Sequence, residues 1–162
     1  MARHPAIIRT ERLTLRGIDE TDTDEIVRWR SAPEVYRYFK APHPLTAEEH
    51  LNWFRARYLR DENRCDWMCL RREDGQKLGV FGLIRGHGTA EVSYLLAPEA
   101  QHCGYAGEAV RALMDYAAEA WGIDRFTAEI HTDNAPSAAL AARLGFRPRR
   151  QEGDFIIYET EG

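Results

Sequence analysis

Apolar and polar positions along the chain follow two different periods, which predict a mixture of strands and helices. Alternating runs, and short apolar runs between turn residues, predict strands. These runs cover residues 12–16, 67–71, 77–85, 89–96, 125–130 and 154–158. Apolar stripes of helical period that follow capping residues predict helices. These stripes cover residues 21–30, 47–58, a segment after Gly107 that runs to about residue 121, and residues 134–144.

The order of these elements predicts an α/β fold with a mixed, mostly antiparallel sheet. Two helices follow the first strand, and three strands then follow one another through short turns at 72–76 and 86–88. Strands joined by tight turns pair antiparallel, whereas a doubly wound sheet needs a crossover helix between successive strands. Because the last two strands each follow a helix, we expect a sheet of six to seven strands flanked by about four helices.

Composition narrows the class of protein. The 162 residues fit one domain over residues 1–162, with 44% hydrophobic residues and a formal net charge of −4. This balance gives no electrostatic reason to bind nucleic acid, and no apolar run approaches the roughly 20 residues of a membrane span. Three cysteines and six histidines show no metal-ligand spacing. We therefore expect a cytoplasmic protein with no nucleic-acid partner, no membrane partner and no metal.

The segment 91–110 predicts a binding loop for a phosphorylated cofactor. It places Gly104 and Gly107 between a strand and an amphipathic helix. Glycines let the backbone pass close to a bulky group, and the free N–H groups at a helix N-terminus hold phosphate oxygens. No Gly-Lys-Ser/Thr follows the loop, and the third glycine of a dinucleotide fingerprint is absent. The ligand is therefore neither a mononucleotide in a P-loop nor a dinucleotide in a Rossmann fold.

Two motifs carry a resemblance to a known family. The run Gln101-His102-Cys103-Gly104-Tyr105-Ala106 resembles the acyl-CoA pyrophosphate loop (Q/R-x-x-G-x-G/A) of the GNAT N-acetyltransferase superfamily. Residues 131–137, followed by Leu144-Gly145-Phe146, are similar to the second signature of that superfamily, N-x-x-S ending in L-G-F. Residues 10–16 resemble the subgroup that acetylates ribosomal-protein N-termini (RimJ/RimL-like). The region 29–53 is similar to relatives that acetylate amino groups on nucleotide-linked sugars.

The resemblance implies that acetyl-CoA (coenzyme A) is wedged between two splayed strands, the fourth and fifth of the predicted sheet. Its pyrophosphate would lie on the amides of residues 103–107, and its pantetheine arm would pair with the backbone at 95–97. Asn134 would bond to that arm or its surroundings, or act only as a helix cap. The implied cofactor-binding residues are Leu95, Leu96, Ala97, Gln101, His102, Cys103, Gly104, Tyr105, Ala106, Gly107 and Asn134.

Acetyl transfer to an amine needs a base, because such an amine is mostly protonated at pH 7. Glu91 is our candidate, acting directly or through a water, and its alternative role is a solvated or ion-paired strand residue. Ser93 faces the same side by strand alternation. Many superfamily members use a tyrosine as the acid where this chain has Ala141. Ser137 is therefore the candidate acid, with a plain capping role as its alternative.

The acceptor is predicted only by class. Trp29, Tyr38 and Trp53 are candidate substrate-binding residues, although the two tryptophans also suit the core. The main hypothesis is an N-acetyltransferase in which a small amine or a protein N-terminus attacks acetyl-CoA directly in a ternary complex. Alternatives are a nucleotide-linked amino sugar as acceptor, or a non-catalytic acyl-CoA sensor, to which the missing tyrosine points. Dimerisation is common in such folds, so a homodimer is compatible with this prediction.

Overall fold

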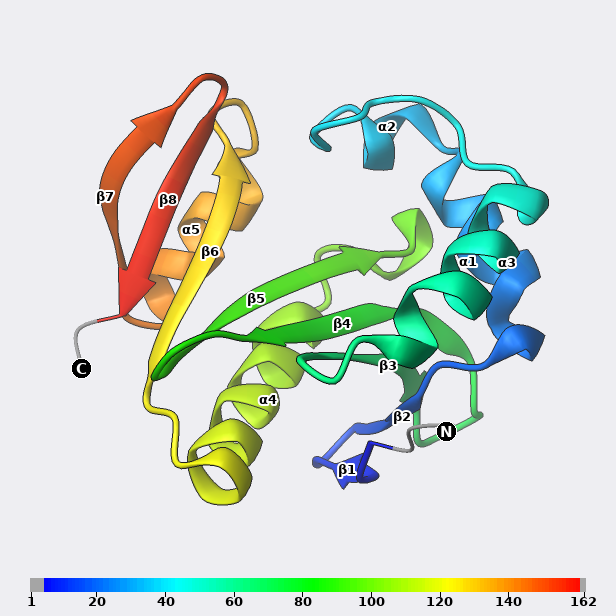
Figure 1. Ribbon diagram of the computed structural model, residues 1–162, viewed down its shortest axis with the longest axis horizontal. Helices are drawn as coiled ribbons and strands as arrows, with labels where there is room; N and C mark the ends of the chain where they lie inside the picture. The colour runs from blue at the N-terminus through cyan, green and yellow to red at the C-terminus, as the bar shows by residue number, and fades with distance from the viewer. Residues whose placement is uncertain (1–4, 161–162) are drawn as a thin grey trace.

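The computed structural model describes residues 5–160, which form one eight-stranded sheet (Figure 1). Its order is β1-β2-β3-β4-β5-β6-β8-β7, and every neighbouring pair is antiparallel except β5 and β6. The strands are β1 (Ile8–Arg9), β2 (Leu13–Gly17), β3 (Arg64–Arg71), β4 (Lys77–Arg85), β5 (Thr89–Leu96), β6 (Arg125–His131), β7 (Phe146–Glu152) and β8 (Phe155–Thr160). The predicted mixed, mostly antiparallel sheet is confirmed.

Helices cover both halves of the sheet. They are α1 (Thr23–Arg30), α2 (Pro33–Tyr36), α3 (Ala47–Ala56), α4 (Tyr105–Trp121) and α5 (Ala135–Arg143), with short 3₁₀ turns at Glu20–Asp22, Tyr58–Arg60 and Pro98–Ala100. The capping box between Thr46 and Glu49 opens α3 as predicted. Helix α4 packs along β1, β2, β4 and β5, and α5 packs against β6 and β7. Leu13, Trp67, Phe81 and Leu113 are fully buried between these layers.

The parallel strands β5 and β6 separate soon after they pair. Their register contains only Thr89↔Arg125, Ala90↔Phe126 and Glu91↔Thr127. Beyond these pairs the two strands diverge, which Figure 1 shows as an open wedge between the green and yellow arrows. This confirms the splay that was expected between the fourth and fifth predicted strands. Alternate backbone groups of residues 92–96 consequently face the wedge rather than a neighbouring strand.

The prediction differed from the structure at β1, β7 and α2. Strand β7 was missed because its sequence, Phe-Arg-Pro-Arg-Arg-Gln-Glu, has no apolar alternation: after Phe146 every residue is exposed. It lies at the edge of the sheet, where one neighbour suffices, and its register shifts between Pro148 and Arg150. Strand β1 has two residues and α2 has four, too few to show a period. The sheet therefore has eight strands instead of six to seven.

Candidate active site

Two adjoining cavities occupy the wedge between β5 and β6. The inner cavity, of about 260 Å³, reaches from Ser137 to Glu91 and Glu129. The outer cavity, of about 350 Å³, runs along residues 101–107. Both cavities are lined by Tyr38, Phe39, Tyr94, Asn134, Ser137 and Leu140. The glycine loop and the Glu91 carboxyl thus lie at opposite ends of one continuous space.

The loop at the outer cavity turns its backbone through two left-handed residues. His102 has φ 66° and Gly104 has φ 79°, and α4 begins directly afterwards at Tyr105. His102 is the one residue other than glycine with positive φ in the described range 5–160. The first N–H groups of a helix have no intrahelical acceptor, and the helix dipole makes this end positive. The loop therefore lines the outer cavity at the positive end of α4, and its main-chain N–H groups are the predicted donors.

Arg12 fastens this loop to the start of β2. Its Nε donates to Glu108 Oε1 at 2.7 Å, and its Nη1 donates to the Cys103 carbonyl at 3.0 Å. Its guanidinium also lies over the Tyr105 ring, 4.6 Å from the centroid. Glu108 holds the pKa of Arg12 above its usual value, chiefly through the side-chain hydrogen bond. Sequence reasoning gave Arg12 no role at the loop, because no local pattern reports a contact over some 90 positions.

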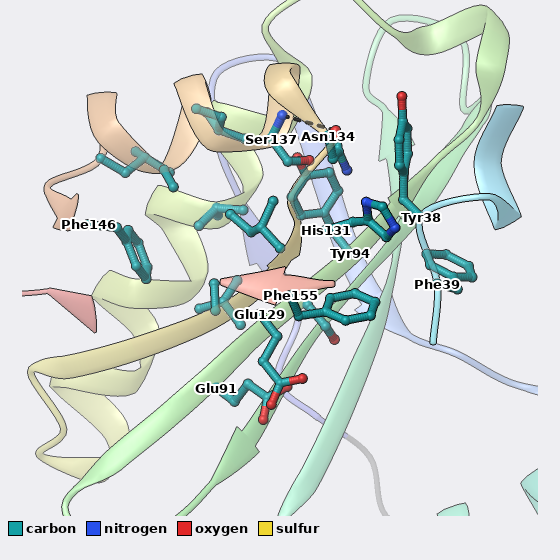
Figure 2. Close-up of a pocket in the computed structure, with 18 of the residues that line it drawn as sticks. Tyr38, Phe39, Glu91, Tyr94, Glu129, His131, Asn134, Ser137, Phe146 and Phe155 are labelled. Carbon is teal, nitrogen blue, oxygen red and sulfur yellow. Dashed lines mark hydrogen bonds between the residues drawn. The ribbon is translucent and has the colours of Figure 1, made fainter. Parts of the chain in front are cut away.

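A pair of hydroxyl groups stands where the two cavities meet. The Tyr94 hydroxyl lies 2.7 Å from Ser137 Oγ (Figure 2). Asn134 Oδ1 accepts the Ser137 N–H at 3.3 Å, so Asn134 is the N-cap of α5. The Tyr94 ring stacks on Phe81 with centroids 5.4 Å apart. Burial raises the pKa of Tyr94, although the hydrogen bond with Ser137 lowers it in part. Sequence reasoning missed Tyr94, which read as one apolar position of a strand.

Two carboxyl groups close the other end of the inner cavity. Glu91 on β5 and Glu129 on β6 lie together there in Figure 2. Burial raises the pKa of Glu91, the charge of Glu129 raises it further, and Lys40 and Arg64 oppose the shift. Glu129 forms an ion pair with Lys40, and this pairing raises the pKa of the lysine. The sequence analysis did not identify Glu129. Its position beside Glu91 becomes evident only when β6 is seen to pair with β5.

An aromatic wall lies between the hydroxyl pair and the carboxyl groups. The His131 ring centroid lies 5.8 Å from that of Tyr38 and 5.3 Å from that of Phe155 (Figure 2). The backbone N–H of Asp133 donates to His131 Nδ1 at 3.0 Å. In its neutral form this imidazole therefore carries its proton on Nε2. The connection after α2 supplies Tyr38 and Phe39, so this segment covers the cavity on the side opposite β6.

Most residues predicted for the site line the two cavities. The outer cavity is lined by Leu95, Leu96, Gln101, His102, Gly104, Tyr105, Ala106, Gly107 and Asn134. The inner cavity is lined by Glu91, Ser93, Ser137 and Tyr38. Ala97 is fully buried, its N–H donates to the Leu78 carbonyl, and its carbonyl accepts the Ala100 N–H, whereas the exposed Cys103 contributes its carbonyl to Arg12.

Trp29 and Trp53 correct the prediction of an aromatic acceptor pocket. Trp29 is only 1% exposed, and Trp53 packs partly buried on the core beside Tyr58, with ring centroids 5.2 Å apart. Neither side chain lines the inner or the outer cavity. Their helices turn the apolar faces toward the sheet, which leaves Tyr38 as the predicted substrate residue at the cavity.

Over residues 5–160, no cluster of three or more His, Cys, Asp or Glu side chains is arranged to hold a metal ion. In the same range, no helix has the length and apolar character needed to cross a membrane.

A family match and a curated relative agree with this geometry. Residues 12–147 match the acetyltransferase (GNAT) domain, and the chain belongs to this family. It is 30% identical over 146 residues to the uncharacterized N-acetyltransferase YoaA of Bacillus subtilis (strain 168), covering 87% of this chain and 82% of that protein. The chain is accordingly an N-acetyltransferase that uses acetyl-CoA.

Solved structures share the fold at lower identity. Spermidine N-acetyltransferase from Vibrio cholerae, in complex with CoA and spermine, matches with a TM-score of 0.80 and 17% identity, over 93% of this chain and 94% of that chain. The ribosomal L7/L12 alpha-N-protein acetyltransferase RimL matches with a TM-score of 0.78 and 21% identity, over 95% of this chain and 93% of that chain. At these identities the likeness concerns the fold.

Proposed function

We propose that acetyl-CoA binds in the outer cavity, that an amine acceptor binds in the inner cavity, and that the amine attacks directly in the ternary complex. When bound, the cofactor supplies an acetyl thioester as the donor. The observation that supports this arrangement is the continuous space from the glycine loop to Glu91, with Tyr94 and Ser137 at its middle. The residues present fit such a cofactor, since main-chain donors and an unpaired strand edge line its proposed path.

The glycine loop and β5 would bind different parts of the cofactor. The N–H groups of residues 104–107 would hold the diphosphate at the positive end of α4. The backbone at residues 95–96, at the end of β5 beside the wedge, would pair with the amide groups of the pantetheine arm, whereas the N–H of Ala97 already donates to the Leu78 carbonyl. Asn134 already caps α5 through its side-chain oxygen, which leaves its amide NH₂ to donate to that arm.

Glu91 would act as the general base. Its carboxylate would take a proton from the acceptor ammonium, directly or through a water, so that a neutral nitrogen attacks. A carboxyl group whose pKa is raised is a stronger base than an ordinary glutamate. Burial is the main cause of this shift, and burial also keeps Glu91 away from competing solvent.

Ser137 and Tyr94 would provide the acid. Ser137 would donate a proton toward the departing sulfur, and the Tyr94 hydroxyl at 2.7 Å would in turn donate to Ser137 Oγ. Because burial raises its pKa, Tyr94 keeps its proton at neutral pH. This hydroxyl pair would replace the tyrosine that the chain lacks at Ala141, which itself lines the inner cavity.

The charges of the inner cavity favour a cationic amine as the acceptor. Glu91 and Glu129 outweigh the single charge of Lys40 at this end, and the net negative charge attracts an ammonium group and repels the phosphates of a nucleotide sugar. Small polyamines and protein N-termini both carry such a group. The names of the spermidine and RimL structures describe acceptors of these two kinds. We propose this class for the chain and leave the choice within it to experiment.

A panel of polyamines, peptides and amino sugars with thiol release from acetyl-CoA as the readout tests the proposal. Glu91→Gln should lower kcat/KM for the best acceptor by roughly 10²- to 10⁴-fold, the usual worth of a general base. Glu119→Gln, on the exposed surface of α4, is the matched control and should have no effect. If CoA binds but no amine is acetylated, the sensor alternative replaces the proposal.

We also propose one acetyltransferase domain over residues 1–162 and a cytoplasmic location. One continuous sheet through the described residues supports the first proposal. The three free cysteines, two of them buried, support a reducing compartment. A homodimer stays a prediction that light scattering on the purified chain would test.

A further inference from the structure

The chain contains few lysine side-chain amines for a protein with so many basic residues. Of its 22 lysine and arginine residues, 20 are arginine, and the lysines are Lys40 and Lys77. A guanidinium keeps its charge at any physiological pH and does not act as an acetyl acceptor, whereas a lysine amine does so once it loses a proton. The two lysines lie in very different surroundings.

Lys40 places its amine at the acceptor end of the inner cavity. It follows Tyr38 and Phe39 in the connection between α2 and α3, and it lines the inner cavity together with Glu91. Its Nζ pairs with the Glu129 carboxylate and lies 5.6 Å from the centroid of the Phe155 ring. Glu91 is close enough that its charge contributes to the raised pKa of Lys40.

Lys77 has no access to this cavity. It begins β4, and its Nζ lies 2.7 Å from both Asp22 Oδ1 and Glu25 Oε1. Asp22 is fully buried and also binds Arg16, so Lys77 belongs to a closed ion-pair cluster beneath α1. Neither the inner nor the outer cavity is lined by Lys77. Lys77 is therefore a lysine of the same chain whose amine does not reach the inner cavity.

The ion pair that holds Lys40 is easily broken. Its side chain is 67% exposed, and an exposed pair contributes at most about 1 kcal/mol. The amine can therefore leave Glu129 and move along the cavity wall without a large cost. Its flexible four-carbon stem gives it the reach for such a movement.

We propose that Lys40 is a self-acetylation site, at which the chain acetylates its own amine when acetyl-CoA is bound and no acceptor fills the inner cavity. This inference rests on the proposed function. The Nζ–carbon bond forms at the acetyl carbonyl, and the carbon–sulfur bond of the thioester breaks. Of the two protons that the nitrogen loses, one ends on the CoA sulfur and the other reaches solvent through a carboxylate at the acceptor end.

Acetylation would change the entrance to the cavity. An acetylated lysine carries no charge, so it can neither pair with Glu129 nor make the cation–π contact with Phe155. The segment with Tyr38 and Phe39 would then lose this ion pair and keep the ring contact between Tyr38 and His131. Glu129 would be free to hold the ammonium group of an incoming acceptor.

Incubation of the full chain with acetyl-CoA and no amine tests this proposal, with peptide mapping by mass spectrometry over time. Lys40 should approach one acetyl group per chain, at least about 100-fold faster than Lys77, because the cavity holds its amine beside the donor. The rate constant should not depend on protein concentration, and it should rise with pH as the ammonium loses its proton. Lys77→Arg should leave this reaction unchanged, and Lys40→Arg should abolish it.

The outcomes separate the two proposals. Equal acetylation of Lys40 and Lys77, or a rate proportional to protein concentration, overturns self-acetylation in the cavity. Turnover of an external amine with Lys40 unmodified overturns the inference alone and leaves the proposed function standing. If neither an amine nor Lys40 is acetylated although CoA binds, the proposed function fails together with the inference.

Discussion

Gly104 offers a direct test of the loop because its backbone lies in the left-handed region, with φ 79°. Replacing it with alanine should cost about 1–2 kcal/mol of folding free energy, since a Cβ atom disfavours this conformation. The added Cβ would lie 3.4 Å from Arg12 Nη2, the movable end of an exposed side chain, so steric strain adds little. For a chain of this size the melting temperature should fall by about 2–4 °C per kcal/mol.

The effect of Gly104→Ala on CoA binding should exceed its effect on stability. If the backbone relaxes away from the left-handed region, an N–H group no longer points at the diphosphate. A hydrogen bond to a charged group is worth about 1.5–3 kcal/mol, which is roughly a 10- to 100-fold weaker Kd. Titration calorimetry with CoA, beside scanning calorimetry, measures both quantities.

Gly122→Ala is the matched control for this experiment. Gly122 follows the other end of α4 with φ 67°, and a Cβ there would meet nothing within 4 Å. The variant should show the same loss of stability with an unchanged CoA affinity. Equal CoA affinity in Gly104→Ala and Gly122→Ala would refute the claim that amides near residue 104 hold the diphosphate.

Three further predictions concern the acid, the base and the anchor of the loop. Because burial raises the pKa of Glu91, kcat/KM should fall with decreasing pH at a pH above the ordinary glutamate value of about 4.3. Glu129→Gln should move this fall to lower pH, and an unmoved profile would exclude Glu91 as the titrating group. Tyr94→Phe, which keeps the ring on Phe81, should cost about 1 kcal/mol of stability and lower kcat by about 10-fold or more, and steady-state kinetics should show a non-additive double variant with Ser137→Ala. Arg12→Gln should weaken CoA binding several-fold, measured by titration, with the pH profile of the rate unchanged.

The parts of the fold and site that rest on local patterns were predictable from the sequence. The glycine loop, the Asn134 cap and the capping box at Thr46 each occupy a few consecutive residues with a defined geometry. The Glu91 hypothesis used its place on the strand expected to line the cofactor together with the family resemblance, and its role as a base stays a prediction. By contrast, β7 carries no alternation, because an edge strand exposed on both faces needs none.

Contacts between distant segments could not be predicted in this way. Tyr94 meets Ser137 across 43 positions, and Arg12 meets Cys103 across 91. Glu129 belongs to the candidate site because β6 pairs with β5, and the sequence of neither strand indicates which strand is its neighbour. The prediction that Trp29 and Trp53 bind the acceptor was wrong for a related reason. An aromatic residue on an amphipathic helix suits the core and a pocket equally well, and the sequence does not show which of the two its side of the helix faces.

Strands β5 and β6 pair over a short stretch before they diverge. Three backbone pairs join β5, which carries Glu91 and Tyr94, to β6, which carries Glu129, and buried side chains from both sides, such as Leu113 and Phe146, belong to one hydrophobic core. The hydrogen bond between Tyr94 and Ser137 spans the wedge beyond this stretch, and the ion pair between Lys40 and Glu129 lies at the same cavity. A small rotation where the two strands pair would change the spacing of acid and base together, so whatever fills the wedge also sets the geometry in which the chemistry takes place.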